Sequence, residues 1–307
     1  MTEPDDDTRA GLAYGFSAYL LWGSAPLFFP LLEPAGWVEI LAQRILWSLV
    51  VVAALLAFTR GFAGVRRVLR NRDQYLRLLG AAAMITVNWA VYIWGVNSGH
   101  VVECSLGYFI NPLFTILLGV VLLKERLRPA QWVAVGIGAA AVIVIAVDYG
   151  RPPWIALALA VSFGLYGFLK KKARVGAADS LAIETGVLCI PSAIALVVVS
   201  ANGDLVFAHH GLGNSLLLAS SGVVTAVPLL CFAAATQRLP LSVVGLLQYL
   251  TPVLQFLVGV GIRHEHVPFA EFVGFCLVWV ALILLSADAV KRQRSTGRLS
   301  RAEHAVV

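Results

Sequence analysis

Charged residues are scarce in this chain of 307 residues, because Lys, Arg, Asp and Glu make up only 13% of it while hydrophobic residues make up 59%. A water-soluble globule of this length needs more polar surface than that composition supplies. The scarcity excludes a soluble domain and indicates an integral membrane protein embedded in a lipid bilayer. The net charge is +6, but no soluble domain is present to carry a nucleic-acid site, so we expect no nucleic-acid partner.

Cysteine is also scarce, and the four cysteines stand singly, without the paired spacing of a metal site. The histidines at 209–210 and at 264 and 266 lack the spacing that puts two ligands on one helical face. No Gly-rich phosphate loop appears, and the serine motif YGFSA around Ser17 lacks the second glycine of a nucleophile turn. The sequence therefore predicts no metal, no cofactor and no catalysis. An intramembrane enzyme and a channel remain the alternatives, although no carbonyl-filter or charge-ring motif supports a channel.

Long apolar runs are what the chain has in abundance. Ten of them are long enough to cross roughly 30 Å of hydrocarbon. They cover residues 11–32, 37–58, 75–97, 101–123, 130–147, 152–169, 180–200, 214–236, 241–262 and 269–287.

Most of the basic residues fall in alternate loops and in the segment after Asp288, a pattern typical of cytoplasmic segments. The start, MTEPDDDTRA, is acidic and lacks the basic region of a secretory signal. We therefore expect residues 1–10 and 288–307 to be cytoplasmic tails. The second tail is basic and suited to anionic lipid headgroups.

An internal duplication sets the expected architecture. Residues 105–125, SLGYFINPLFTILLGVVLLKE, recur in diverged form as residues 245–265, GLLQYLTPVLQFLVGVGIRHE. The copies belong to spans four and nine, an odd number of spans apart, so they cross the membrane in opposite directions. The sequence predicts an all-α membrane protein of ten transmembrane helices in a 5+5 inverted repeat, with halves 11–147 and 152–287 and both termini cytoplasmic.

A proline stands in the middle of each copy, Pro112 in the first and Pro252 in the second. A midspan proline breaks the helix and frees a backbone carbonyl, here that of Tyr108 or Gln248. Paired broken spans in corresponding halves point to a transport site. Asn111 lies near the expected midplane and is the best candidate for a substrate contact, although it could equally satisfy the kink, and Gln248 and Tyr249 add polar groups to the second copy.

Arg44 is the basic residue deepest within a span, and a permanent cation there needs partners. Glu39, Glu103 or backbone carbonyls of another helix could provide them, and Arg44 could equally bind an anionic group. His100 and Glu103 are close enough to form a proton-coupling pair, but their position within a turn of the expected interface favours a wet vestibule for both. Other cavity candidates are Asn88, Tyr92, Trp22 and Tyr166. Gly136 and Gly138 would suit a homodimer face.

The segments YLLWGSAPLFF, EILAQRILWS, NWAVYIWGVNSGHVVECSLGYFINP, SFGLYGFLKKK and LQYLTPVLQF occur in this order along the chain. Together they resemble the RarD group of EamA transporters, in the drug/metabolite transporter superfamily. The resemblance implies ten helices and a bacterial inner-membrane permease that exports small organic metabolites or drugs, with chloramphenicol as the usual label of the group. It implies as functional positions Trp22, Glu39, Arg44, Asn88, Tyr92, Asn97, His100, Glu103, Tyr108, Asn111 and Tyr249.

Overall fold

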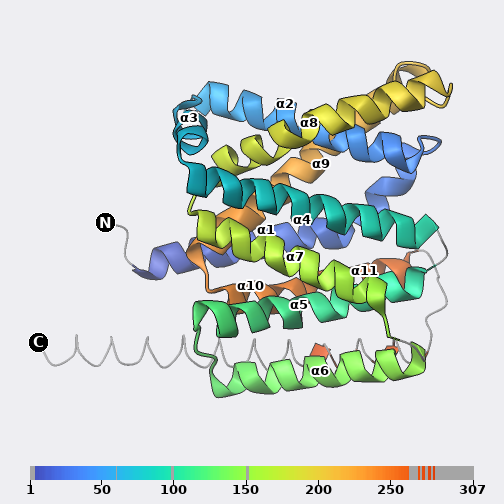
Figure 1. Cartoon of the computed structure of the whole chain (residues 1–307). Helices are drawn as coiled ribbons and strands as arrows, with labels where there is room; N and C mark the ends of the chain where they lie inside the picture. The colour runs from blue at the N-terminus through green and yellow to red at the C-terminus, as the bar shows by residue number, and fades with distance from the viewer. Residues whose placement is uncertain are drawn as a thin grey trace, which may run out of the picture.

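The computed structural model describes residues 4–59, 61–97, 100–149, 152–262 and single positions between 269 and 280. Every regular element in this part is a helix, and the helices run roughly parallel or antiparallel to one another (Figure 1). They are α1 (Pro4–Phe28), the 3-10 helix η1 (Phe29–Leu32), α2 (Trp37–Thr59), α3 (Ala63–Arg70), α4 (Arg72–Asn97), α5 (Val101–Leu123), α6 (Pro129–Tyr149), α7 (Trp154–Ala173), α8 (Ala177–Ala201), α9 (Gly211–Arg238), α10 (Leu241–Gln248) and α11 (Leu250–Gly261).

The predicted spans from 11–32 to 241–262 each fall on helices of the structure. Five helices in the described part are long and apolar enough to cross a bilayer, so the chain is a multi-pass membrane protein. The predicted span 269–287 and the predicted tail 288–307 lie outside the continuously described residues. The count of ten spans therefore stays a prediction.

Two regions expected to be irregular are helical. Helix α1 begins at Pro4, so residues 4–10 of the expected tail belong to it, and the acidic residues there suit the positive end of the helix dipole. The expected loop after α2 contains α3, which buries Val68 against Leu78 of α4 and Ile183 of α8. These helices were missed because they are short or polar and lack the length of a span.

The two midspan prolines have different effects. The ninth predicted span is interrupted, because α10 ends at Gln248 and α11 begins at Leu250, close to Pro252. The prediction of a break is therefore correct for this span. Helix α5 instead continues through Pro112 without a break. Neighbouring helices can hold a proline-containing helix together in a bundle.

The halves of the chain are interleaved. Helix α2 packs against α8 and α9, α4 against α7 and α8, and α5 against α7 and α10. Two glycines permit the closest approaches: a Cβ at Gly222 of α9 would lie 2.5 Å from the backbone carbon of Trp47, and one at Gly245 of α10 would lie 2.9 Å from the carbonyl oxygen of Pro112. Backbones of helices from different halves therefore touch directly.

Three carboxylates of the first half bind backbone N–H groups of the second half. Glu39 accepts hydrogen bonds from Val206 and Phe207 at 3.0 and 2.8 Å. Glu103 accepts one from Ile155 in the first turn of α7, at 2.7 Å. Glu125 accepts bonds from Leu241 and Ser242 in the first turn of α10, at 2.7 and 2.8 Å. We call Glu39, Glu103 and Glu125 the carboxylate clamps. Glu103 and Glu125 accept from N–H groups in the first turn of a helix, which have no acceptor within that helix.

Replacing Glu125 with Ala should lower the free energy of unfolding by about 1.5–3 kcal/mol, because the N–H groups at the start of α10 lose a charged acceptor. A thermal melt of the purified protein in detergent measures this. Asp204→Ala, which removes an exposed carboxylate, is the matched control. Equal melting temperatures for the two variants would contradict the clamp role of Glu125.

Candidate functional site

Arg44 of α2 lies between two aromatic rings. Its guanidinium carbon is 5.1 Å from the ring centroid of Phe29 in η1 and 5.1 Å from that of Trp89 in α4. Its Nε donates a hydrogen bond of 2.9 Å to Oγ1 of Thr225 in α9. A cation between desolvated rings gains about 2 kcal/mol or less from each. These contacts together can offset the roughly 2.5–3.5 kcal/mol cost of an Arg in the bilayer core.

No ion pair joins Arg44 to a carboxylate in the part of the chain that the structure describes. Of the partners expected from the sequence, Glu39 instead binds the loop at Val206 and Phe207, and Glu103 binds Ile155. The expectation was wrong on this point because the nearest acids in sequence face backbone donors on other helices. Within the same described part, Arg44 uses only Nε for hydrogen bonding, so its two terminal nitrogens are left available.

Two tyrosines complete the surroundings of Arg44. Tyr92 of α4 and Tyr108 of α5 lie near the guanidinium. Their rings lie edge to face, with centroids 6.0 Å apart. We call Arg44, Phe29, Trp89, Tyr92, Tyr108 and Thr225 the Arg44 cluster. It offers a cation, aromatic faces and hydroxyl groups from five elements.

A small cavity opens beside this cluster, between α2, α4, α7, α8 and α9. Trp89 and Thr225 of the Arg44 cluster form part of its wall. The remaining lining residues are Ile45, Ser48, Ile85, Tyr166, Leu181, Glu184, Thr185, Leu188 and Leu229. The cavity therefore joins the surroundings of a cation to those of a buried carboxylate, Glu184.

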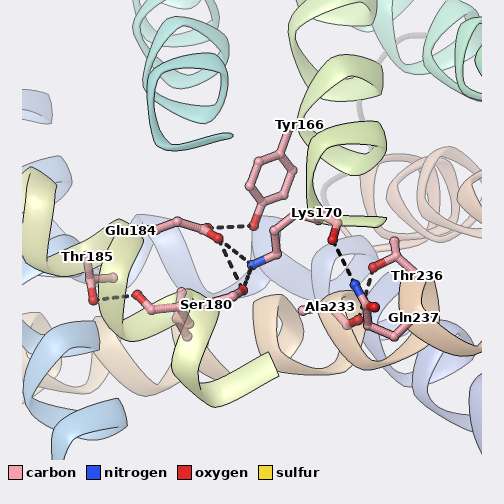
Figure 2. Close-up of polar contacts among 9 residues, drawn as sticks. Tyr166, Lys170, Ser180, Glu184, Thr185, Ala233, Thr236 and Gln237 are labelled. Carbon is pink, nitrogen blue, oxygen red and sulfur yellow. Dashed lines mark hydrogen bonds and ion pairs between the residues drawn. The ribbon is translucent and has the colours of Figure 1, made fainter. Parts of the chain in front are cut away.

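Glu184 belongs to a buried polar network that links α7 to α8 (Figure 2). Its Oε1 lies 2.6 Å from Nζ of Lys170, and its Oε2 accepts a hydrogen bond of 3.1 Å from the hydroxyl of Tyr166. Ser180 accepts a hydrogen bond from Lys170 and donates one of 3.3 Å to Glu184. We call Tyr166, Lys170, Ser180 and Glu184 the Lys170 network. The exposed fractions of the Lys170 and Glu184 side chains are 1% and 3%, so this ion pair is fully buried.

A second polar group surrounds the paired prolines, where α5 meets α10. Four buried oxygens there have no hydrogen-bond partner among the described residues: those of Asn111, Thr115, Gln248 and Tyr249. Asn111 is 8% exposed and Gln248 is 6% exposed. The structure thus places the polar residues predicted beside Pro112 and Pro252 in the bundle interior, with unsatisfied acceptors.

The aromatic candidates Trp22 and Tyr166 lie in one cluster. Trp22 contacts Phe163 and Phe232 at centroid distances of 5.8 and 5.7 Å. The Tyr166 ring stacks on Phe232 at 5.6 Å with an interplanar angle of 12°. Packing therefore accounts for both rings, while the hydroxyl of Tyr166 also reaches Glu184.

Asn88 lies at a helix crossing and is already bonded. Its Nδ2 donates to the carbonyl of Leu159 at 2.9 Å and to Oγ of Ser162 at 3.1 Å, both on α7. These bonds link α4 to α7 and leave the amide nitrogen without a free proton.

The remaining candidates gather toward the other end of the bundle, away from α3. The ring of His100 stacks on Trp94 at 5.5 Å, and Glu103 has an exposed fraction of 0%. A wet vestibule position for Glu103 was therefore wrong, because helix α7 covers it. The side chain of Asn97 lies outside the described residues. Gly138 packs against Tyr249 of its own chain, so it is not free for a dimer face, whereas Gly136 faces open space.

The sequence places Glu184 about a turn inside its span, close enough to pair with one of the lysines at 170–172. The structure confirms this pairing for Lys170, 14 positions earlier in the chain. The part of Ser180 in the same network was not predicted. Phe29 and Thr225 carry no comparable signal, because only the folded chain brings them to Arg44.

The fold and these clusters define a multi-pass membrane protein with polar side chains gathered inside a helical bundle, as in membrane transporters. The sequence profile described as the EamA-like transporter family matches residues 9–147 and again residues 152–287. The chain belongs to this family and, within it, to the RarD group, as its relatives show.

Among these relatives, Protein RarD of Streptomyces exfoliatus is 52% identical over 304 residues, covering 99% of this chain and 96% of that one. Protein RarD of Escherichia coli (strain K12) is 38% identical over 291 residues, covering 95% and 98% of the two chains. The Chloramphenicol-sensitive protein RarD of Pseudomonas aeruginosa is 28% identical over 292 residues, covering 94% and 97%. The chain is therefore a membrane transporter.

A solved structure titled "Crystal structure of protein" has a similar fold, with a TM-score of 0.69 at 20% sequence identity. The match covers 90% of this chain and 96% of that one. At this identity the likeness concerns the fold alone.

Replacing Asn88 with Ala should lower the free energy of unfolding by about 0.6–1.7 kcal/mol, the range of interhelical hydrogen bonds in membrane proteins. Thr86→Ala is the matched control, because Thr86 bonds only the carbonyl of Ala82 in its own helix. Thermal melts in detergent compare the two. A transport defect in Asn88→Ala at unchanged stability would show instead that Asn88 serves the substrate.

Proposed function

We propose that this protein is a secondary transporter that exports small organic molecules across the bacterial inner membrane by alternating access. The Arg44 cluster binds a polar or anionic group of the substrate. The observation that carries the proposal is a permanent cation inside the bundle, beside a cavity, with no carboxylate partner among the described residues.

The composition of the Arg44 cluster defines the kind of ligand it suits. A guanidinium presents its donors in a planar fork that matches carboxylates and similar oxygen pairs. The rings of Trp89 and Phe29 each lie 5.1 Å from the guanidinium carbon, and these contacts restrict its orientation before the ligand arrives. Tyr92 and Tyr108 add aromatic surface next to it. A molecule with an oxygen-rich group and an aromatic or apolar body fits this set of groups.

An inverted repeat would supply the movement. Under the 5+5 scheme, α2 corresponds to α8 and α5 corresponds to α10 and α11, and both of these pairs are in contact. The contact of α4 with α7 likewise has a counterpart in the contact of α9 with α1. This symmetry of packing supports two related halves with a shared centre. Two such halves can rock about that centre and open it to alternate sides.

The basic loops support the orientation. The chain from the end of α2 to the first turns of α4, and the stretches around the ends of α5, α7 and α9, lie at one end of the bundle, on the left in Figure 1, and hold most of the basic residues. We call this side the basic end and propose that it faces the cytoplasm, with both termini on that side. The bacterial relatives support the inner membrane as the location.

A secondary transporter accounts for the site better than a channel or an enzyme does. The small cavity beside the Arg44 cluster has a single carboxylate among its described lining residues and not a ring of one charge. Catalysis would need a nucleophile paired with a base, which the Arg44 cluster does not offer. The name of the Pseudomonas relative makes chloramphenicol the first compound to test.

Wild type should lower the accumulation of labelled chloramphenicol in a transporter-depleted bacterial host, and an uncoupler should abolish the difference. Arg44→Ala should reduce this export by tenfold or more, about 1.4 kcal/mol of lost binding, because the cationic fork is gone. Arg67→Ala, an exposed arginine of α3, is the control at matched membrane abundance. Equal accumulation with vector and wild type would remove chloramphenicol as a substrate. Equal export by Arg44→Ala and wild type would overturn the binding role of Arg44.

Asn111→Ala should lower transport without lowering membrane abundance. The Asn111 amide oxygen is buried and has no partner among the described residues, so its removal costs the fold little. Initial rates of transport at several substrate concentrations, together with quantitative immunoblots, test this. An unchanged rate would assign Asn111 to the kink of α5 and exclude it as a substrate contact.

A further inference from the structure

The carboxylate of Glu184 differs from the carboxylate clamps in what it binds. Glu39 and Glu125 accept backbone N–H groups, and Glu125 also accepts the Ser242 hydroxyl; none of these donors is charged. Glu184 is bound by the side chains of Tyr166, Lys170 and Ser180, and one of these donors is a cation. A proton added to Glu184 would therefore leave the cation of Lys170 without its counterion.

Stability alone is a weak reason for a buried ion pair. Removing two charges from water costs about as much as their attraction returns, so apolar residues of similar size often serve as well. Breaking one partner, by contrast, leaves an uncompensated charge inside the protein and is strongly unfavourable. An ionisable pair inside a membrane bundle is more often a relay or a coupling site than a structural support.

The position of Glu184 connects this pair to the transport cavity. Glu184 lies in the cavity wall, together with Tyr166 from α7 and Thr185 from α8 itself. The polar residues that face it across the cavity are Ser48 of α2, Trp89 of α4 and Thr225 of α9, and none of these carries a charge. Among the described lining residues, Glu184 is the one carboxylate. Thr225 in turn accepts the hydrogen bond of Arg44.

The bonds around Lys170 determine which helices a proton would separate. Helix α7 is tied to α9 by bonds to backbone oxygens: Gln237 donates to the carbonyl of Lys170 at 2.7 Å, and Lys171 donates to the carbonyls of Thr236 and Leu239. Neutralising a carboxylate leaves these ties unchanged. Helix α7 is tied to α8 at this end through Glu184 and Ser180, as Figure 2 shows.

We propose that Glu184 is the proton-binding site that couples this transporter to the proton gradient, and that its protonation releases α8 from α7 at the basic end. The proposal rests on the proposed transport function for its purpose, but the movement can be tested without a substrate. One proton from the water outside the cell adds to a carboxylate oxygen of Glu184, and Lys170 keeps its own proton. The charge of Lys170 then lacks its counterion, so the network is more stable when the basic end opens and water reaches it. Release of the proton into the water at the basic end restores the ion pair and closes this end.

The test measures access to the cavity from the basic end. In a variant whose four native cysteines are replaced by alanine, a cysteine at Leu181 reports opening, because Leu181 lines the cavity and is 1% exposed. Glu184→Gln keeps the shape of the side chain but is permanently neutral. At one fixed pH, this change should speed labelling of that cysteine by a small water-soluble thiol reagent by about tenfold or more, since a minor open state becomes dominant.

The controls separate coupling from damage to the fold. Glu125→Gln alters a carboxylate that binds backbone groups at the same end, and it should leave the labelling rate unchanged. Glu184→Asp should restore slow labelling at neutral pH, and its rate should rise as the pH falls. Rates are normalised to an exposed cysteine at Gly176, and thermal melts verify that each variant is folded. Equal labelling of the wild-type background and Glu184→Gln, or equal acceleration by Glu125→Gln, would overturn the proposal.

A transport measurement distinguishes this failure from failure of the proposed function. In proteoliposomes loaded with chloramphenicol, Glu184→Gln should lose proton-driven movement but keep exchange of labelled for unlabelled compound within about twofold, because exchange needs no net proton transfer. Proton-driven movement by Glu184→Gln at the wild-type rate would overturn the coupling role. Absence of both activities in wild type would contradict chloramphenicol transport and leave the labelling result to decide the role of Glu184.

Discussion

The cost of placing charged and polar groups inside a membrane bundle governs this structure. Each such group needs a partner, and the fold provides three kinds. The carboxylate clamps bind backbone N–H groups, Lys170 and Glu184 bind each other, and Arg44 lies between aromatic rings. The first solution joins helix ends and loops, the second is the pair that we propose for proton coupling, and the third leaves a positive charge with free donors that we propose for substrate recognition.

The two polar clusters are close enough to influence each other through one small cavity. Thr225 accepts the hydrogen bond of Arg44 and lines the same wall as Glu184. A substrate oxygen drawn to Arg44 would compete with Thr225, while a proton on Glu184 would change the field in the cavity. Substrate binding at Arg44 would thus change the surroundings of Glu184, and protonation of Glu184 would change those of Arg44. Both effects pass through the shared cavity wall, so no long series of intermediate residues is needed. This short separation is the physical basis that we propose for linking substrate movement to a proton.

Much of the fold could be predicted from the sequence, because length and hydropathy decide where a helix can cross a membrane. The spans from 11–32 to 241–262 were predicted on these grounds, and the break near Pro252 followed from proline chemistry. The partners of Arg44 were not predicted, since Thr225 is 181 positions away and carries no distinguishing pattern. Glu39 and Glu103 were assigned as possible mates of Arg44 on sequence distance, whereas the structure pairs them with backbone groups that have no side-chain signal.

In all three carboxylate clamps, the acid comes from the first half of the chain and the N–H group comes from the second half. During synthesis the first half enters the membrane before these backbone N–H donors exist, and the three acids gain them only when residues 155, 206–207 and 241–242 follow. Each half is thus an incomplete fold on its own. Under the proposed 5+5 repeat, an ancestral five-helix chain with this arrangement would have required a second copy of itself.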